Sequence, residues 1–124
     1  MQEREKVYTE FEYGDARKSC EAARIVWAEA HTKAVVIHFM NHNNVMDSIR
    51  VNHNSLLQIV GRHKGSFVMI NRHTIVRRRF MLGIQPNHEK EGTYTLSARF
   101  VEHPLEISRR RLPIVEAALD SKKA

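Results

Sequence analysis

The sequence has little of what marks a secreted, membrane or metal-binding protein. Its one cysteine, Cys20, cannot form an internal disulfide, and no pair of cysteines is present to hold zinc. No apolar run approaches the length of about 18 residues that a transmembrane helix needs, and the charged N-terminus has no apolar segment typical of a signal peptide. A chain of 124 residues is expected to fold as one domain, residues 1–124, in the cytoplasm.

The motifs of common enzymes are also absent. The sequence contains no GxSxG, no P-loop and no GxGxxG. Cys20 has basic neighbours that could lower the pKa of its thiol, but no partner base can be assigned, so we expect a thiol without function. Among the eight histidines there is no HExxH or HxH, and Glu29 and Asp47 look like isolated carboxylates. We therefore expect no enzyme activity, no metal, no cofactor and no small-molecule substrate.

Acidic residues are scarce in the second half of the chain. Residues 1–62 hold 8 Lys and Arg against 8 Asp and Glu, whereas residues 63–124 hold 12 against 6. The whole net charge of +6 therefore lies in the second half, much of it in two arginine clusters, residues 77–79 and 109–111. The arginine side chain can hold a phosphate or a guanine edge with two hydrogen bonds. This asymmetry indicates an anionic partner, which would be nucleic acid, a membrane surface or an acidic protein.

Alternating and β-branched runs predict several short strands. Residues 93–100 alternate most clearly, with apolar side chains at every second position on one face. The residues Trp27, Phe39 and Tyr94 are expected in the core, and residues 29–34 are expected to form a loop. The strands are expected at residues 7–13, 25–28, 35–39, 93–100 and 105–107, with two further apolar runs at 67–70 and 75–76.

Two helices are expected among these strands. Asn54 and Ser55 would begin the first helix, with Ser55 and Gln58 as a capping box, and Gly65 would end it. Pro113 suits the first turn of the second helix. The fold class is therefore mainly β with two short helices. The positions expected to be buried are Leu56, Ile59, Val60 and His63 in the first helix and Ile114, Val115, Ala118 and Leu119 in the second.

The stretch FVMINRHTIVRRRF, residues 67–80, concentrates positive charge without a glycine, a proline or an acidic residue. Its polar centre, residues 71–74, would project from a sheet edge as a rigid turn that carries Arg72. The alternative is an ordinary hydrogen-bonded turn in which Asn71 satisfies backbone groups.

The two arginine clusters differ in their setting. On a strand, Arg77 and Arg79 would share one face, because successive side chains alternate. Residues 109–111 lie at or before the start of the second expected helix, where the helix dipole makes positive charge unfavourable unless an anion is present. A phosphate backbone would supply that anion. The alternative is a solvated or ion-paired cluster without function.

Three segments stand in a recognisable order: RIVWAEAHTKAVVIHF, MDSIRVNHNSLLQIVGRHKGSFVMINRHTIVRRRFMLGI and LEISRRRLPIVEAAL. This order resembles the LytTR DNA-binding domain, the effector domain of many bacterial response regulators of the LytR/AlgR/AgrA kind. The resemblance covers roughly residues 20–120. Its most specific parts are a strand ending in Glu29 and Ala30, the pattern of residues 67–76 after a short helix, and Ser-Arg-Arg before the last helix.

The resemblance implies an elongated stack of small β-sheets whose loops enter successive major grooves of duplex DNA. It implies that Arg109 contacts bases, that Arg72 contacts DNA from the middle turn, and that residues 31–33 supply the remaining contact. Asn71 and His73 depart from the residues usual in the family, which leaves the target sequence open. The residues expected at DNA are His31, Thr32, Lys33, Asn71, Arg72, His73, Arg77, Arg79, Arg109 and Arg110.

The predicted function is a transcriptional regulator that binds a specific duplex sequence. The resemblance implies paired direct repeats and two protomers on the DNA, and it fits either a stand-alone regulator or an excised effector domain. Two other functions stay open. One is a protein-interaction module held by a membrane or acidic protein partner, and the other is a basic RNA-binding domain. The scarcity of aromatic residues expected at the surface speaks against RNA.

Overall fold

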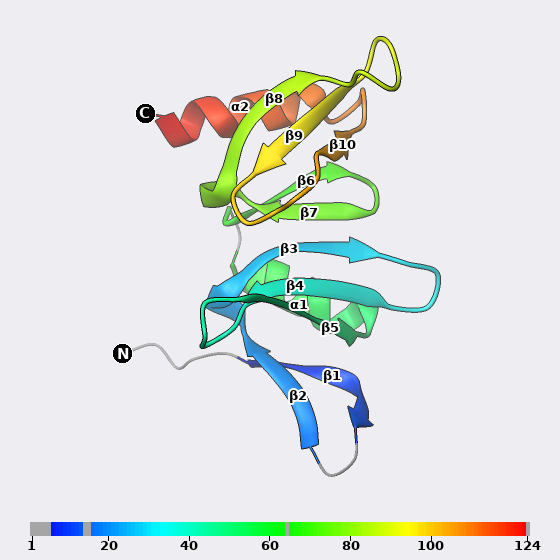
Figure 1. Ribbon diagram of the computed structural model, residues 1–124, viewed down its shortest axis with the longest axis vertical. Helices are drawn as coiled ribbons and strands as arrows, with labels where there is room; N and C mark the ends of the chain where they lie inside the picture. The colour runs from blue at the N-terminus through cyan, green and yellow to red at the C-terminus, as the bar shows by residue number, and fades with distance from the viewer. Residues whose placement is uncertain (1–5, 14–15, 64, 124) are drawn as a thin grey trace. The chain divides into compact units, whose positions relative to one another are not determined.

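The computed structural model describes residues 6–13, 16–63 and 65–123. The chain divides into two compact units, Met1–Lys64 and Gly65–Ala124, and each is described by itself below. Figure 1 labels their helices and strands. Within the described residues, no helix is long and apolar enough to cross a membrane.

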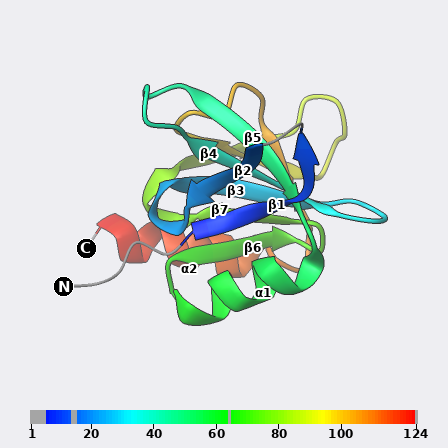
Figure 2. The same ribbon diagram turned by 90° about the horizontal axis from the view of Figure 1, so that it is seen from below.

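The first unit is built from antiparallel strands. Two of them, β1 and β2, form a hairpin, and β3, β4 and β5 follow one another as antiparallel neighbours. A single residue, Asn52, separates β5 from the helix α1, and Figure 2 shows the chain passing directly from the strand into the helix. The elements are β1 (Lys6–Tyr13), β2 (Ala16–Glu21), a short 3-10 turn (Ala22–Arg24), β3 (Ile25–Ala30), β4 (Val35–Met40), β5 (Met46–Val51) and α1 (His53–Arg62).

The core of the first unit follows the hydrophobic pattern of its strands. On β4 the buried side chains are those of Val35, Ile37 and Phe39, at every second position, while residues 25–28 of β3 are all buried. The predicted burial of Trp27 and Phe39 is confirmed. Burial of this apolar surface is the main force that holds the strands together.

The helix α1 begins earlier than the sequence suggested. It starts at His53, and the residue before it provides the cap: Asn52 Oδ1 accepts hydrogen bonds from the Ser55 backbone N–H at 2.9 Å and from the Ser55 hydroxyl at 3.1 Å. The expected capping box on Ser55 is therefore wrong. The run Asn52-His53-Asn54-Ser55 holds three residues able to cap, and sequence alone does not choose among them.

The second unit combines a hairpin, a three-stranded sheet and a helix. The hairpin is β6–β7, and the antiparallel sheet has the order β10-β9-β8. The helix α2 packs against β6, β8 and the 3-10 turn η2. The elements are β6 (Phe67–Asn71), β7 (Thr74–Arg77), η2 (Arg78–Phe80), β8 (Met81–Pro86), β9 (Tyr94–Ala98), β10 (Leu105–Ile107) and α2 (Leu112–Lys123).

Several details of the second unit correct the expectations. Strand β9 ends at Ala98, and Phe100 lies beyond it with a φ of 71° and a 41% exposed side chain. Tyr94 is 40% exposed and is not a core residue, whereas Thr95 on the opposite face is buried. In α2 the side chain of Ile114 is exposed, although Val115 and Leu119 are buried as predicted. The predicted class, mainly β with two helices, is confirmed.

The cysteine is a buried residue of β2. Burial, together with the smaller effects of the Asp47 and Glu21 carboxylates, raises the pKa of the Cys20 thiol to about 12. The basic neighbours in the sequence therefore do not lower this pKa. The structure presents an inert thiol.

We predict that Cys20 is unreactive in the folded protein. A pKa near 12 in place of the ordinary 9.0 leaves about a thousandfold less thiolate at pH 8, and only the thiolate attacks a disulfide reagent. Reaction with a chromogenic disulfide should therefore be slow in buffer and fast in denaturant. Rapid labelling of the native protein would contradict the buried position.

Candidate functional site

Two segments of the second unit are bound together by hydrogen bonds. The Asn71 side-chain amide donates to the Glu106 carbonyl at 2.7 Å. The Ser108 backbone N–H donates to the Ile70 carbonyl at 3.1 Å, and Arg111 Nε donates to the Met69 carbonyl at 2.8 Å. The turn of the β6–β7 hairpin and the segment between β10 and α2 thus form one surface. We call residues 71–73 together with 108–111 the double turn.

The first half of the double turn is a tight polar turn. Asn71 Oδ1 accepts a hydrogen bond from the His73 backbone N–H at 2.8 Å, so the same side chain shapes the turn and ties it to its neighbour. Arg72 and His73 are exposed, and Arg72 Nε donates to His73 Nε2 at 3.0 Å. The interpretation of Asn71 as a residue that satisfies backbone groups is confirmed.

The second half of the double turn leads into α2. The Ser108 carbonyl accepts hydrogen bonds from the backbone N–H groups of Arg111 at 3.0 Å and Leu112 at 3.1 Å. Arg109 and Arg110 are exposed. A Cβ built on Gly92 would lie 3.7 Å from Arg109 Nη2, so the guanidinium rests beside the connection between β8 and β9.

The exposed guanidinium groups of the double turn form no ion pair with the acidic side chains that the structure describes. In residues 6–13, 16–63 and 65–123, no ion pair involves Arg72, Arg109 or Arg110. The clustered guanidinium groups also precede the positive end of the α2 dipole, which makes the arrangement electrostatically unfavourable by itself. An anion bound at the double turn would relieve both costs.

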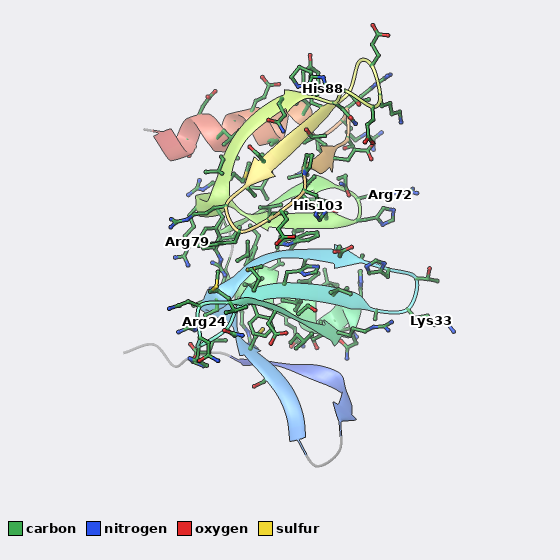
Figure 3. All side chains as sticks on the ribbon, viewed as in Figure 1. Arg24, Lys33, Arg72, Arg79, His88 and His103 are labelled. Atoms are coloured by element: carbon green, nitrogen blue, oxygen red, sulfur yellow. The ribbon has the colours of Figure 1, made fainter. Side chains whose placement is uncertain are left out.

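Arg77 and Arg79 do not belong to the double turn. Arg77 is only 8% exposed and lies 4.4 Å above the Phe67 ring, and burial, followed by the charge of Arg79, lowers its pKa to about 10. Strand β7 ends at Arg77, so the expectation that Arg77 and Arg79 share a strand face is wrong. Figure 3 shows Arg79 at the end of the β6–β7 hairpin away from Arg72. Their predicted contact with DNA stays untested, and these positions do not favour it.

In the first unit, the expected contact loop is the connection between β3 and β4. The His31 backbone N–H donates to the Ala34 carbonyl at 2.8 Å and closes the turn. Thr32 and Lys33 are exposed, and Figure 3 shows Lys33 at the tip, pointing away from the unit. The strand β3 continues to Ala30, so this loop is shorter than the expected residues 29–34.

A carboxylate at the base of this loop binds two histidines. Glu29 Oε1 lies 3.0 Å from His31 Nε2, and Glu29 Oε2 lies 2.7 Å from His38 Nε2. The His38 ring stacks on Trp27 with the ring centroids 4.1 Å apart and the planes at 10°. Glu29 is therefore not the isolated carboxylate that the sequence suggested. No group of three or more possible metal ligands occurs in the part of the chain that the structure describes.

A comparison with solved structures identifies the fold. The chain matches, with a TM-score of 0.66, a structure described as the LytTr DNA-binding domain of a methyl-accepting/DNA response regulator from Bacillus cereus. The match covers 95% of this chain and 98% of the other, at 17% sequence identity. The fold is that of a LytTR domain. No family model matches the sequence, and no curated protein matches it either.

The sequence predicted which residues of this candidate site are exposed better than it predicted the hydrogen bonds that hold them in place. His31, Thr32, Lys33, Arg72, His73, Arg109 and Arg110 were all expected at the surface and are all exposed. The bonds from Arg111 to Met69 and from Asn71 to Glu106 join residues 42 and 35 positions apart, and no local pattern reveals them. The pairing of Glu29 with His31 had one available signal, which is their closeness in the sequence, since His31 follows directly after the end of β3.

We predict that Asn71→Ala loosens the double turn. The substitution removes the bond to Glu106 and the bond from His73 N–H, so the free energy of unfolding should fall by about 1–3 kcal/mol. Denaturant titration measures this loss, and hydrogen exchange at the His73 amide should quicken.

The matched control is Arg72→Ala in the same turn. Its side chain is exposed, so its loss should change the free energy of unfolding by less than about 0.5 kcal/mol. Equal effects of the two substitutions would contradict the structural role of Asn71.

Proposed function

We propose that the protein is a transcriptional regulator that binds a specific sequence of duplex DNA through the double turn. The observation that carries this proposal is a rigid surface with three guanidinium groups, those of Arg72, Arg109 and Arg110, and no ion pair among the described residues. The phosphate backbone of DNA is an anion that fits such a surface. The LytTR fold supports the proposal, since the matched structure is described as a DNA-binding domain.

The three exposed arginines of the double turn have distinct roles in the proposal. Arg109, whose guanidinium rests beside Gly92, reads a base edge in one major groove, where an arginine can donate two hydrogen bonds to guanine. Arg110 and Arg72 hold phosphates, which fix the register but carry no sequence information. His31 to Lys33 contact a second groove. Arg77 has no contact in this proposal, because its guanidinium is buried over Phe67.

Rigidity favours binding in this arrangement. The three hydrogen bonds of the double turn fix the two segments before DNA arrives, so less conformational entropy is lost on binding. In this proposal, residues 1–124 are a single bacterial DNA-binding domain that acts in the cytoplasm. Two protomers would bind paired direct repeats, and the domain needs no cofactor.

A second function has a specific observation in its favour. At the other end of the second unit, Arg79 lies 4.8 Å above the Phe80 ring and Arg99 lies 4.9 Å above the Phe100 ring. The two rings contact edge to face at 5.5 Å, and Phe100 is 41% exposed. Exposed arginines on aromatic rings suit the carboxylates of an acidic protein, which keeps a protein-interaction module as the alternative.

We predict that Arg109→Ala costs about 1–3 kcal/mol of binding free energy on the preferred duplex and much less on random duplex. The preferred duplex is obtained by selection from a random pool, and fluorescence anisotropy measures both affinities.

The matched control for this substitution is Arg99→Ala. It removes the same charge at the opposite end of the second unit, so it should leave the preference between the two duplexes unchanged. Equal losses on both duplexes for Arg109→Ala would rule out base recognition by this residue.

We predict that Arg110→Ala weakens binding to all duplexes by a similar factor. Loss of one phosphate contact should reduce the slope of log affinity against log salt concentration by about one unit. The slope is measured by repeating the titration at several salt concentrations. An unchanged slope would remove Arg110 from the phosphate contacts.

A further inference from the structure

Glu29 connects the exposed loop of the first unit to its core. The chain of contacts runs from Trp27, which is 6% exposed, through the stacked ring of His38 to the carboxylate and on to His31. Trp27 and His38 are paired across β3 and β4, so the sheet sets the position of the His38 ring. His31 therefore contacts a carboxylate whose other oxygen is already bound to His38.

A carboxylate also influences which ring nitrogen of a histidine carries a proton. A carboxylate oxygen favours a proton on the ring nitrogen beside it. This favours a proton on Nε2 of His38, which is hydrogen-bonded to Glu29 Oε2, and on Nε2 of His31, which lies 3.0 Å from Glu29 Oε1. In a neutral His31 ring, Nδ1 is then an acceptor. The side chain of His31 is 54% exposed, which leaves this ring open to a partner.

We propose that Glu29 is a positioning residue that sets how His31 recognises a base. This inference rests on the proposed DNA binding. In the major groove, an acceptor at Nδ1 pairs with an amino group, which adenine and cytosine present and thymine and guanine do not. Glu29 thus acts through the orientation and proton of His31 and does not touch DNA itself. It confers a preference for adenine or cytosine at one position of the bound sequence.

The substitution Glu29→Gln tests this role because it keeps the shape and changes the hydrogen bonding. A glutamine side chain has one acceptor and one donor in place of two acceptors. His38, at 2.7 Å and held by Trp27, should keep the acceptor oxygen. His31 would then receive a hydrogen bond from the amide, so its proton would move to Nδ1.

Two measurements follow from this change. Nitrogen NMR of the free protein at pH 8, where an ordinary imidazole is neutral, should show the His31 proton on Nε2 in the wild type and on Nδ1 in Glu29→Gln. Selection from random duplexes should show the preference for a base with an amino group replaced by a preference for a base with an acceptor, so that guanine and thymine become accepted and cytosine is rejected. Affinity for the wild-type duplex should fall roughly threefold to tenfold.

Two control variants distinguish an effect of Glu29 on the His31 ring from the loss of its negative charge and from a general structural effect of the substitution. Loss of a negative charge alone favours DNA binding, so Glu102→Gln, at an exposed carboxylate of the second unit, should bind equally or more tightly. In a His31→Ala background, Glu29→Gln should change the affinity for the wild-type duplex less than about twofold, because the residue through which it acts is gone. An equal loss in both backgrounds would overturn the inference.

Failure of the proposed function and failure of this inference are distinguishable. A wild-type protein without preference among duplexes refutes specific DNA binding, and the NMR measurement on the free protein then decides the role of Glu29 by itself. A His31 proton that stays on the same nitrogen in Glu29→Gln overturns the inference, whatever the DNA titrations give. A proton that moves to Nδ1 supports it.

Discussion

The double turn depends on three hydrogen bonds to main-chain groups of β6 and β10. The carbonyls of Met69, Ile70 and Glu106 accept from Arg111, Ser108 and Asn71 respectively. Each of these bonds uses a group of one segment to fix the other. Hydrogen bonds of this kind contribute about 1 kcal/mol each to stability. Their main effect here is to fix the positions of the two segments relative to each other. They hold clustered positive charge in one place despite its mutual repulsion.

The charge and its support come from different residues. Arg111 Nε donates a hydrogen bond to the Met69 carbonyl of β6, while Arg109 and Arg110 are exposed. A run of three identical residues therefore contains one structural residue and two surface residues. The run at 77–79 divides in another way. Arg77 is buried over Phe67, and Arg79 lies over Phe80 at the far end of the hairpin. Charge runs in a sequence therefore say little about function until each guanidinium has been placed.

Sequence patterns predicted most of the local elements but missed the strands β2, β5 and β8, and they predicted the long-range contacts poorly. Short runs rich in apolar and β-branched residues located β4 and β10, and every second side chain of each strand is buried. On β9 the rule of period-two alternation held for Leu96 and Ala98. It failed for Tyr94, which is 40% exposed, and for Phe100, because β9 ends at Ala98. The cap of α1 was misplaced because neighbouring residues had equal capping ability. Contacts such as Asn71 with Glu106 depend on how β6 meets β10, which is a property of the whole unit.

The most direct test of the account is to map which amides respond to DNA. The duplex selected from a random pool is titrated into the isotope-labelled protein, and the change in each backbone amide signal is followed by NMR. The largest changes are expected at the double turn, in Arg72, His73, Arg109 and Arg110, and at the loop of His31 to Lys33. Smaller changes are expected at the far end of the second unit. Signal changes concentrated at Arg79, Arg99 and Phe100, with unchanged signals in the double turn, would contradict DNA binding through the double turn.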